Sequence, residues 1–296
     1  MESIRKLRIF NEVYRTLNIT RTAEKLFMTQ PAVSRAILEL EEEYSTKLFE
    51  RYHHRLLPTE YAHQLYKRSI HIINSVDELG RIFEDHSDIT LHLGATITIA
   101  SILLPGILER YKKQQPSVNV HVVVANGPSL KEKLINNELD IALIEDAGSH
   151  DDLDAIPFYH DEMVLIFSPS HPLNSRKRIT LNDLTMYPFL MREAGSSQSI
   201  YLEHLFAMEN LNIQPAWQST STHAIINAAA AGLGTAILPS LLVDEALKNG
   251  KVISRPVIDT EMKRTYYIVT HKEKFFTPEL TALRLCCLEE IERSPL

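Results

Sequence analysis

Cysteines, glycine-rich loops and long apolar runs are scarce in this chain of 296 residues. Its only cysteines, Cys286 and Cys287, are adjacent, so they form neither a disulfide framework nor a metal cage. Its nine glycines include no GxSxG elbow and no Walker loop, and its histidines include no HExxH pair. We therefore predict no catalytic residues, no metal and no cofactor. No apolar run is long enough to cross a bilayer, and the N-terminus lacks a signal-peptide layout, which predicts a cytoplasmic protein without membrane contact.

An excess of positive charge is also missing, because the formal net charge is -7. Nucleic-acid binding normally requires a basic surface. The charge is uneven, however, since the first 60 residues hold ten Lys or Arg and nine Asp or Glu, which leaves twenty-one and twenty-nine for the remainder. The acidity therefore lies mostly outside the first segment, and DNA binding by that segment stays possible.

Three short helices are predicted in the first segment. Thr20 can cap the second helix and Thr29 the third, in whose first turn Pro31 costs no hydrogen bond. Apolar residues recur at helical spacing, and in the third helix Val33, Ile37 and Leu40 point inward. This pattern predicts a small helical domain.

The outer face of the third predicted helix carries Gln30, Ser34, Arg35 and Leu38. Gln can bond adenine with two hydrogen bonds, and Arg can bond guanine or a phosphate. Ser can bond a phosphate or either type of base edge. A solvated polar face on an ordinary helical bundle explains the same three polar residues, and for these residues alone that explanation is the better one. The next segment changes the balance.

A two-stranded wing is predicted downstream, with Leu48 and Phe49 inside and the basic residues outside. Together, residues 4–65 resemble the winged helix-turn-helix of LysR-type transcriptional regulators. The resemblance rests on Phe10, Thr22-Ala23-Glu24-Lys25-Leu26, Thr29-Gln30-Pro31-Ala32-Val33-Ser34-Arg35, Ile37, Leu40-Glu41, Leu48-Phe49, Arg51, Leu57 and Thr59. It implies that Gln30, Pro31, Ser34 and Arg35 contact DNA, while Arg51, His53 and Arg55 hold phosphates. Ser45 departs from the family pattern at a turn where glycine adopts positive φ more easily.

A single long helix is predicted from Thr59 to about Asp85, on the order of 40 Å long. The apolar or small residues of a coiled-coil seam recur along it at steps of four and three, at Leu65, Ser69, Ile72, Val76, Leu79 and Phe83. This helix either dimerises the chain or packs along the chain's own second domain. The resemblance implies dimerisation and, in the family, further assembly into tetramers.

From residue 89 onward, alternating strands and helices predict parallel α/β sheets with ligands at the carboxyl ends of the strands. The family resemblance continues through 140–144, 170–173 and 232–239, and it implies a two-lobed domain similar to a periplasmic binding protein. The predicted fold class is thus α/β, with three parts: a winged helix-turn-helix at 1–58, a linker helix at 59–88 and an effector domain at 89–296. Lobe one comprises about 89–160 and 262–296, and lobe two about 161–261.

The predicted effector cleft starts at Thr96, Ile97 and Thr98, where hydroxyls and unpaired N–H groups at a helix start favour an anion. Simple capping by Thr98 is nearly as good an explanation. The family pattern adds residues after other strands and at a later helix start, which are Asn126, Glu145, Arg192, Ser221, Thr222 and His223. Arg192 and the threonines would hold a carboxylate or similar anion, and Glu145 and His223 would contact a donor group.

The sequence therefore predicts a DNA-binding transcriptional regulator of the LysR type, modulated by a small anionic effector. Its implied partners are double-stranded operator DNA, the effector, a second copy of the chain and RNA polymerase. The main alternative is a cytoplasmic α/β enzyme acting on a small anionic metabolite. A second alternative, a solute-binding protein, is opposed by the missing signal-peptide layout and by the DNA-binding pattern of the first segment. An enzyme turns its substrate over, whereas a regulator returns its ligand unchanged.

Overall fold

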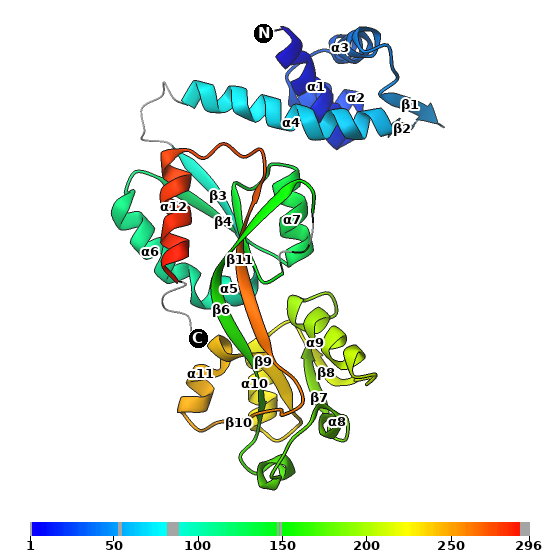
Figure 1. Cartoon of the computed structure of the whole chain (residues 1–296). Coiled ribbons are helices and arrows are strands. Elements are labelled where there is room, and N and C mark those ends of the chain that lie inside the picture. The colour runs from blue at the N-terminus through cyan, green and yellow to red at the C-terminus, as the bar shows by residue number, and fades with distance from the viewer. Residues whose placement is uncertain (1, 53–54, 82–88, 147, 149, 291–296) are drawn as a thin grey trace. The chain divides into compact units, whose positions relative to one another are not determined.

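The computed structural model describes residues 2–52, 55–81, 89–146, 148 and 150–290 (Figure 1). The chain divides into two units, one mainly of residues 1–89 and the other mainly of residues 90–296. None of the described helices is long and apolar enough to span a lipid bilayer. Each unit is described separately below.

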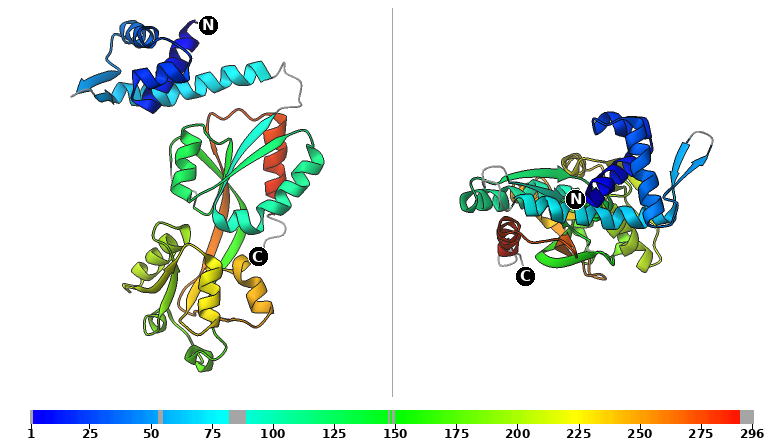
Figure 2. Two further views of the ribbon diagram at one scale, coloured as in Figure 1. Left: turned by 180° about the vertical axis from the view of Figure 1, so that it is seen from behind. Right: turned by 90° about the horizontal axis from the view of Figure 1, so that it is seen from above.

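The described residues of the first unit form four helices and a hairpin. The helices are α1 (Glu2–Thr16), α2 (Ile19–Lys25), α3 (Gln30–Glu43) and α4 (Glu60–Arg81). Strands β1 (Phe49–Tyr52) and β2 (Arg55–Pro58) pair antiparallel and form the wing, which projects beyond the helices in both views of Figure 2. The predicted winged helix-turn-helix is confirmed.

Two local details of this unit differ from or sharpen the prediction. Asn18, and not Thr20, caps α2, because its side chain accepts a hydrogen bond from the Arg21 amide at 3.0 Å. Thr20 lies inside the helix. Ser45 has φ +49°, so the turn after α3 does require the left-handed conformation that glycine adopts more easily.

The apolar core of the first unit joins α1, α2, α3, the wing and one face of α4. The predicted inward residues Val33, Ile37 and Leu40 are buried in it, as are Leu48 and Phe49 of the wing. The α4 residues in this core are Ala62, Tyr66, Ile70 and Ile73. Helix α4 is therefore partly a core element of the first unit and not only a linker.

Ser69 corrects the predicted seam along α4. Its hydroxyl donates to Asn11 Oδ1 on α1 at 2.5 Å, and the residue is fully buried. It therefore faces α1, while Ile72 and Val76 remain 48% and 38% exposed. The described helix ends at Arg81; Phe83 lies outside the described residues, as does the side chain of Leu79.

The second unit is built on a mixed sheet with strand order β10-β6-β11-β5-β3-β4 and with β9 paired to β6. Strand β3 is parallel to both β4 and β5, as predicted, whereas β6, β9, β10 and β11 pair antiparallel. The prediction of purely parallel sheets is therefore wrong for these strands. The strand bounds are β3 (Thr90–Ala95), β4 (Asn119–Val124), β5 (Ile141–Ile144), β6 (Leu153–Phe167), β7 (Phe189–Arg192), β8 (Pro215–Ser219), β9 (Ala236–Pro239), β10 (Ile253–Arg255) and β11 (Lys263–His271).

Two lobes share the long strands β6 and β11, which run from one lobe into the other (Figure 1). In lobe one, α6 and α12 cover one face of the sheet and α7 covers the other; in lobe two, α8 and α9 lie opposite α10 and α11 (Figure 2). The helix bounds are α5 (Ile97–Ile102), α6 (Leu104–Gln114), α7 (Gly127–Ile135), α8 (Leu181–Leu184), α9 (Ser197–Met208), α10 (Thr222–Ala230), α11 (Ser240–Lys248) and α12 (Pro278–Leu288), with a 3₁₀ turn at Pro172–Ser175.

Gly232 and Gly234 lie in the turn that leads into β9, as predicted. Gly232 has φ +77°, and a Cβ at Gly234 would lie 2.4 Å from the carbonyl oxygen of Pro188. Both glycines are therefore explained by the turn and by its close approach to the chain before β7, and they do not form a nucleotide-binding loop.

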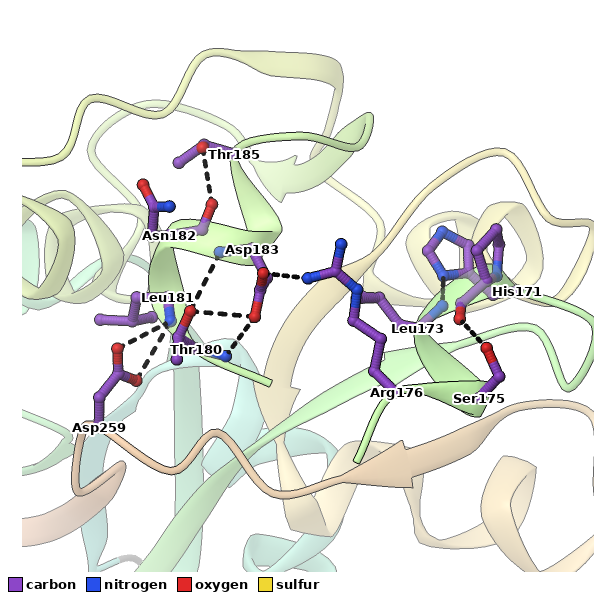
Figure 3. A network of polar contacts seen from close by, with 11 residues as sticks. His171, Leu173, Ser175, Arg176, Thr180, Leu181, Asn182, Asp183, Thr185 and Asp259 are labelled. Carbon is purple, nitrogen blue, oxygen red and sulfur yellow. Dashed lines mark hydrogen bonds and ion pairs between the residues drawn. The ribbon is translucent and has the colours of Figure 1, made fainter. Parts of the chain in front are cut away.

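A network of polar contacts fixes the far end of lobe two (Figure 3). Asp183 accepts hydrogen bonds from the amide and hydroxyl of Thr180 at 2.9 and 3.0 Å and pairs with Arg176. Thr180 in turn accepts from the Asp183 amide, which completes a capping box at the start of α8. Asp259 accepts from the Leu181 amide at 3.1 Å. Helix α8 is thereby anchored to the segment that leads back to lobe one.

Candidate effector-binding site and DNA-binding surface

Helix α3 presents the predicted DNA-contacting residues on its outer side. Gln30, Pro31 and Arg35 are exposed and Ser34 is half-buried. Val33, Ile37 and Leu40, on the inner side of the helix, are buried. Leu38 is 48% exposed on the same helix. The helix thus offers an amide, a hydroxyl, a guanidinium and an apolar group together, as base-edge recognition requires.

Arg35 forms one ion pair and remains largely exposed to solvent. Its Nε donates to Glu39 Oε1 at 2.9 Å, and Glu39 also contacts Lys6 at 3.0 Å. These two cations hold the pKa of Glu39 below its ordinary value through their hydrogen bonds. The Arg35 side chain remains 80% exposed, and exposed pairs of this kind contribute little stability. A phosphate or base edge can therefore displace Glu39.

Glu41 fastens the wing to α3, a role that the sequence argument missed. Its carboxylate accepts hydrogen bonds from the Leu48 and Phe49 amides at 2.9 and 3.2 Å and from Lys47 Nζ at 2.6 Å. Burial alone would raise the pKa of Glu41, but these hydrogen bonds outweigh it and lower the pKa. In the sequence, Leu40-Glu41 is part of the family pattern. That pattern does not show which groups donate hydrogen bonds to the Glu41 carboxylate.

The basic residues predicted on the wing are only partly placed. Arg51 lies on β1 opposite Leu56, and Arg55 lies on β2 opposite Tyr52, in the backbone register of the hairpin. Their side chains, and the whole of His53, lie outside the described part of the structure. Contact of these three residues with phosphates stays a prediction.

A cavity of about 230 Å³ lies between the two lobes of the second unit, and we call it the first cavity. Lobe one supplies the β3–α5 junction and the end of β4, and lobe two supplies the end of β7 and the starts of α9 and α10. Of the predicted effector residues, Thr96, Ile97, Thr98, Asn126, Arg192 and Thr222 line it. The remaining lining residues are Val124, Ala125, Glu193, Ser196, Ser197, Gln198, Leu238, Pro239 and Leu242.

Thr96 and Thr98 are both buried on the lobe-one wall. Thr96, and not Thr98, occupies the cap position of α5, and its hydroxyl makes no cap hydrogen bond. Its Oγ1 is buried without any hydrogen-bond partner. An unsatisfied buried hydroxyl costs about 1–3 kcal/mol, so this group favours a polar ligand. Capping by Thr98 is not observed.

Arg192 brings the positive charge of the first cavity, but Glu193 shares it. Arg192 Nε and Nη2 donate to the two oxygens of Glu193 at 2.8 and 2.9 Å, and Nη1 donates to Thr222 Oγ1 at 3.1 Å. Arg192 is 7% exposed, so its guanidinium is held in position by burial and by these hydrogen bonds. The cavity offers both a cation and a carboxylate, which suits a ligand with an anionic group and hydroxyl donors.

Three of the predicted effector residues do not line this cavity. Ser221 is exposed and caps α10 by accepting a hydrogen bond from the Ala224 amide at 3.3 Å. His223 is exposed on α10 and lines neither of the two cavities described for this unit. Glu145 lines a different cavity. Of these three residues, Ser221 is explained by its capping of α10 and needs no ligand.

Gln198 is a cavity residue that the sequence argument missed. Its Nε2 donates to the Ile237 carbonyl, and its Oε1 is buried without a partner. The signal in the sequence was weak, because a glutamine in the first turn of a helix is an ordinary surface residue. Only the pairing of lobe two's strands places it beside Arg192.

A winged helix-turn-helix joined to a two-lobed α/β unit with a cavity between its lobes defines a DNA-binding regulator with an effector-binding domain. Comparisons with known proteins agree with this class. The family of bacterial regulatory helix-turn-helix proteins, lysR family, matches residues 4–63, and the LysR substrate binding domain matches residues 85–292. The chain therefore belongs to the LysR family of transcriptional regulators.

Individual relatives extend along nearly the whole chain. An uncharacterized HTH-type transcriptional regulator, YeiE, of Escherichia coli is 27% identical over 279 residues, which cover 94% of each chain. A full-length OxyR variant from Pseudomonas aeruginosa has a TM-score of 0.70 at 20% identity and covers 99% of this chain and 98% of its own. The effector-binding domain of QuiR in complex with shikimate has a TM-score of 0.62 at 19% identity and covers 71% of this chain and all of its own. Since the matched relatives are transcriptional regulators, the enzyme alternative is rejected.

Proposed function

We propose that this regulator binds operator DNA through α3 and the wing, and that a small anionic effector in the first cavity changes that binding. The observation that carries the proposal is that both lobes supply walls of this cavity. A ligand held by both walls favours one arrangement of the lobes, and only such a difference in affinity between two arrangements can be transmitted to DNA. The coupling free energy of such systems is typically about 1–3 kcal/mol.

The anionic character of the effector is supported by Arg192 and the hydroxyl of Thr96. The guanidinium is fixed, and an anion that displaces Glu193 from it would gain two hydrogen bonds in the geometry that carboxylates prefer. A structural relative, QuiR, was solved with shikimate, whose carboxylate is of this class. Hydroxyl groups on the effector can be met by Gln198 Oε1 and by Glu193.

Dimerisation through α4 is part of the proposal. Ile72 and Val76 are exposed on the side of the helix that does not enter the core of the DNA-binding unit. A second copy that covers them would place two recognition helices on half-sites about one helical turn of DNA, or a multiple, apart. Action at a promoter also implies RNA polymerase as a partner and the cytoplasm as the place of work.

The DNA-binding half is tested by gel-shift titration of the full chain on the DNA upstream of its own gene, with unrelated DNA as competitor. Arg35→Ala should weaken specific retention by about tenfold, because one charge-assisted contact to a base or phosphate is lost. Lys112→Ala, which removes one exposed positive charge from α6 in the other unit, is the matched control and should leave retention unchanged. Equal retention of wild type and Arg35→Ala at moderate salt would remove Arg35 from the DNA-binding surface.

The effector half is tested with small carboxylates in a thermal-shift screen of the full chain. The carboxylate that raises Tm most is then titrated against Thr98→Val, whose lost hydroxyl should weaken affinity by about tenfold while basal DNA binding is kept. Ser101→Ala, on α5 but outside the cavity, is the control. Unaltered affinity of Thr98→Val would contradict the assignment of the effector to this wall.

A further inference from the structure

A second cavity of about 570 Å³ lies in the same unit, alongside α9. Lobe one contributes the start of α7 and the end of β5, lobe two contributes one face of α9, and β11 passes between them. Ser197 is shared with the first cavity. The residues on which the argument depends are Lys131, Glu145, Asp146, Tyr201, Lys263 and Arg264.

Glu145 is the unusual group in this cavity. It follows directly after β5, it is 6% exposed, and neither of its carboxylate oxygens has a hydrogen-bond partner. Buried polar groups in native proteins nearly always have partners, and a buried carboxylate without one is especially costly. The carboxylate therefore does not stabilise the chain's own fold at this position.

The cations that line the cavity contact groups of the chain other than Glu145. Lys131 lies 3.7 Å from Asp146, and Lys263 lies 2.9 Å from Glu261. The Arg264 guanidinium lies 5.9 Å from the centre of the Tyr201 ring and donates to the sulfur of Met163. None of these contacts reaches Glu145. Among the described residues, no hydrogen bond or ion pair therefore supplies a counter-charge to Glu145.

A metal ion is a poor candidate for that counter-charge. Among the described residues, no group of three or more His, Cys, Asp or Glu side chains is arranged to hold one. Tyr201 and Tyr267 line the cavity instead, and aromatic faces attract organic cations. The basic side chains on β11 would repel a ligand that is purely cationic. A ligand with one positive and one negative group fits this mixed lining best.

We propose that the second cavity is a separate ligand site for a small zwitterion of the amino-acid class. Its ammonium group donates to Glu145, and its carboxylate lies toward Lys263 and Arg264. The proposal goes beyond the effector site of the first cavity, because it concerns different residues and a different charge. Since α9 lines both cavities, the two ligands contact the same helix.

Glu145→Gln tests the first half of the proposal without any ligand. If the carboxylate is kept for a ligand, its removal should raise the Tm of the unliganded full chain by about 2–4 °C, since a buried charge is replaced by a neutral group of equal size. Asp146→Asn, whose side chain is 79% exposed beside Lys131, is the matched control and should not raise Tm. A fall in Tm for Glu145→Gln, or failure to fold, would show that Glu145 is structural and overturn the proposal.

Ligand binding is tested by thermal shift with the free proteinogenic amino acids and their N-acetyl derivatives, followed by calorimetric titration. We expect a free amino acid to raise the Tm of the wild type, its N-acetyl form to have no effect, and Glu145→Gln to bind the free form at least about tenfold more weakly. Absence of any response at millimolar concentration, or an equal response of Glu145→Gln, overturns the proposal. Thr98→Val should keep the amino-acid response, so failure here is distinct from failure of the carboxylate site.

Discussion

The two units of this regulator treat their buried polar side chains differently. In the DNA-binding unit, the buried polar residues among those described, Thr22, Glu41 and Ser69, all make hydrogen bonds within the chain. In the effector-binding unit, Thr96 Oγ1, Gln198 Oε1 and both oxygens of Glu145 make none, and all three residues line cavities. The described buried polar side chains of the first unit are thus satisfied by its own fold, whereas three residues of the second unit keep unsatisfied groups beside cavities. Thr235 Oγ1 and Arg284 Nε are also buried without a partner, although they line neither cavity.

Removal of Glu41 should break this comparison most strongly. Glu41→Ala leaves two buried amides, those of Leu48 and Phe49, without an acceptor, which should cost about 3 kcal/mol of unfolding free energy in the first unit. Denaturant unfolding, followed by circular dichroism, measures the loss, and exposed Glu42→Ala is the control. The sign is opposite to that expected for Glu145→Gln. If Glu41→Ala left the free energy of unfolding unchanged, the wing would not depend on its hydrogen bonds to Glu41.

The same carboxylate predicts a pH dependence. The folded pKa of Glu41 is lowered, so its contribution to stability is complete above the unfolded pKa of about 4.3 and is lost as the pH falls through the lower folded pKa. Glu41→Gln cannot titrate and should flatten this part of the stability profile. Unfolding midpoints of both proteins between neutral and acidic pH provide the measurement. Parallel profiles would assign the acid sensitivity to other carboxylates.

Lobe two allows the comparison to be sharpened inside the second unit. At its far end, shown in Figure 3, both carboxylate oxygens of Asp183 have partners. The cavities, in contrast, contain buried polar groups without hydrogen-bond partners. Asp183→Ala removes the capping box of α8 and should cost about 1–2 kcal/mol, whereas both ligand responses should persist. Asn182→Ala, on the same helix, is the control. Loss of a ligand response would show that this end of the lobe is coupled to a cavity.

The smallest expected effect concerns backbone strain in the first unit. Phe27 has φ +52° and is 98% exposed, so it adopts a left-handed conformation without burying its ring. Asparagine adopts this conformation more easily, and Phe27→Asn should stabilise the unit by about 0.5 kcal/mol. Chemical denaturation against Glu24→Asn, exposed on α2, checks it. A lower stability of Phe27→Asn would show that the Phe27 ring stabilises the unit despite its exposure.

Sequence and structure agree best where the signal is local. Helical spacing and the Thr-Gln-Pro-Ala-Val-Ser-Arg string predicted α3 and its outer face, because both depend on neighbours within one helix. The sequence pattern predicts a single helix over 99–113, but the structure has two helices, α5 and α6, which meet at Leu103. Pro105 sits in the first turn of α6, and since proline cannot donate to the preceding turn, it marks this break.

Long-range pairing explains what the sequence could not provide. The antiparallel strands β6 and β11 pair across about a hundred residues, and alternation of apolar residues does not reveal a partner's direction. The effector residues show the same limit. Thr96, Asn126, Arg192 and Thr222 meet around one cavity, while Glu145, also at a strand end, faces another because β11 passes between the lobes. The strand ends were predictable, but their grouping was not.

The position of β11 between β5 and β6 also determines when lobe one can be completed during synthesis. The ribosome releases β3, β4 and β5 early, but the strand that covers the open edge of β5 emerges only with residues 263–271. Lobe two also needs this part of the chain, because Val257 and Met262 pack in its core and Asp259 accepts a hydrogen bond from the Leu181 amide. Neither lobe can therefore be completed before the ribosome has released the last part of the second unit.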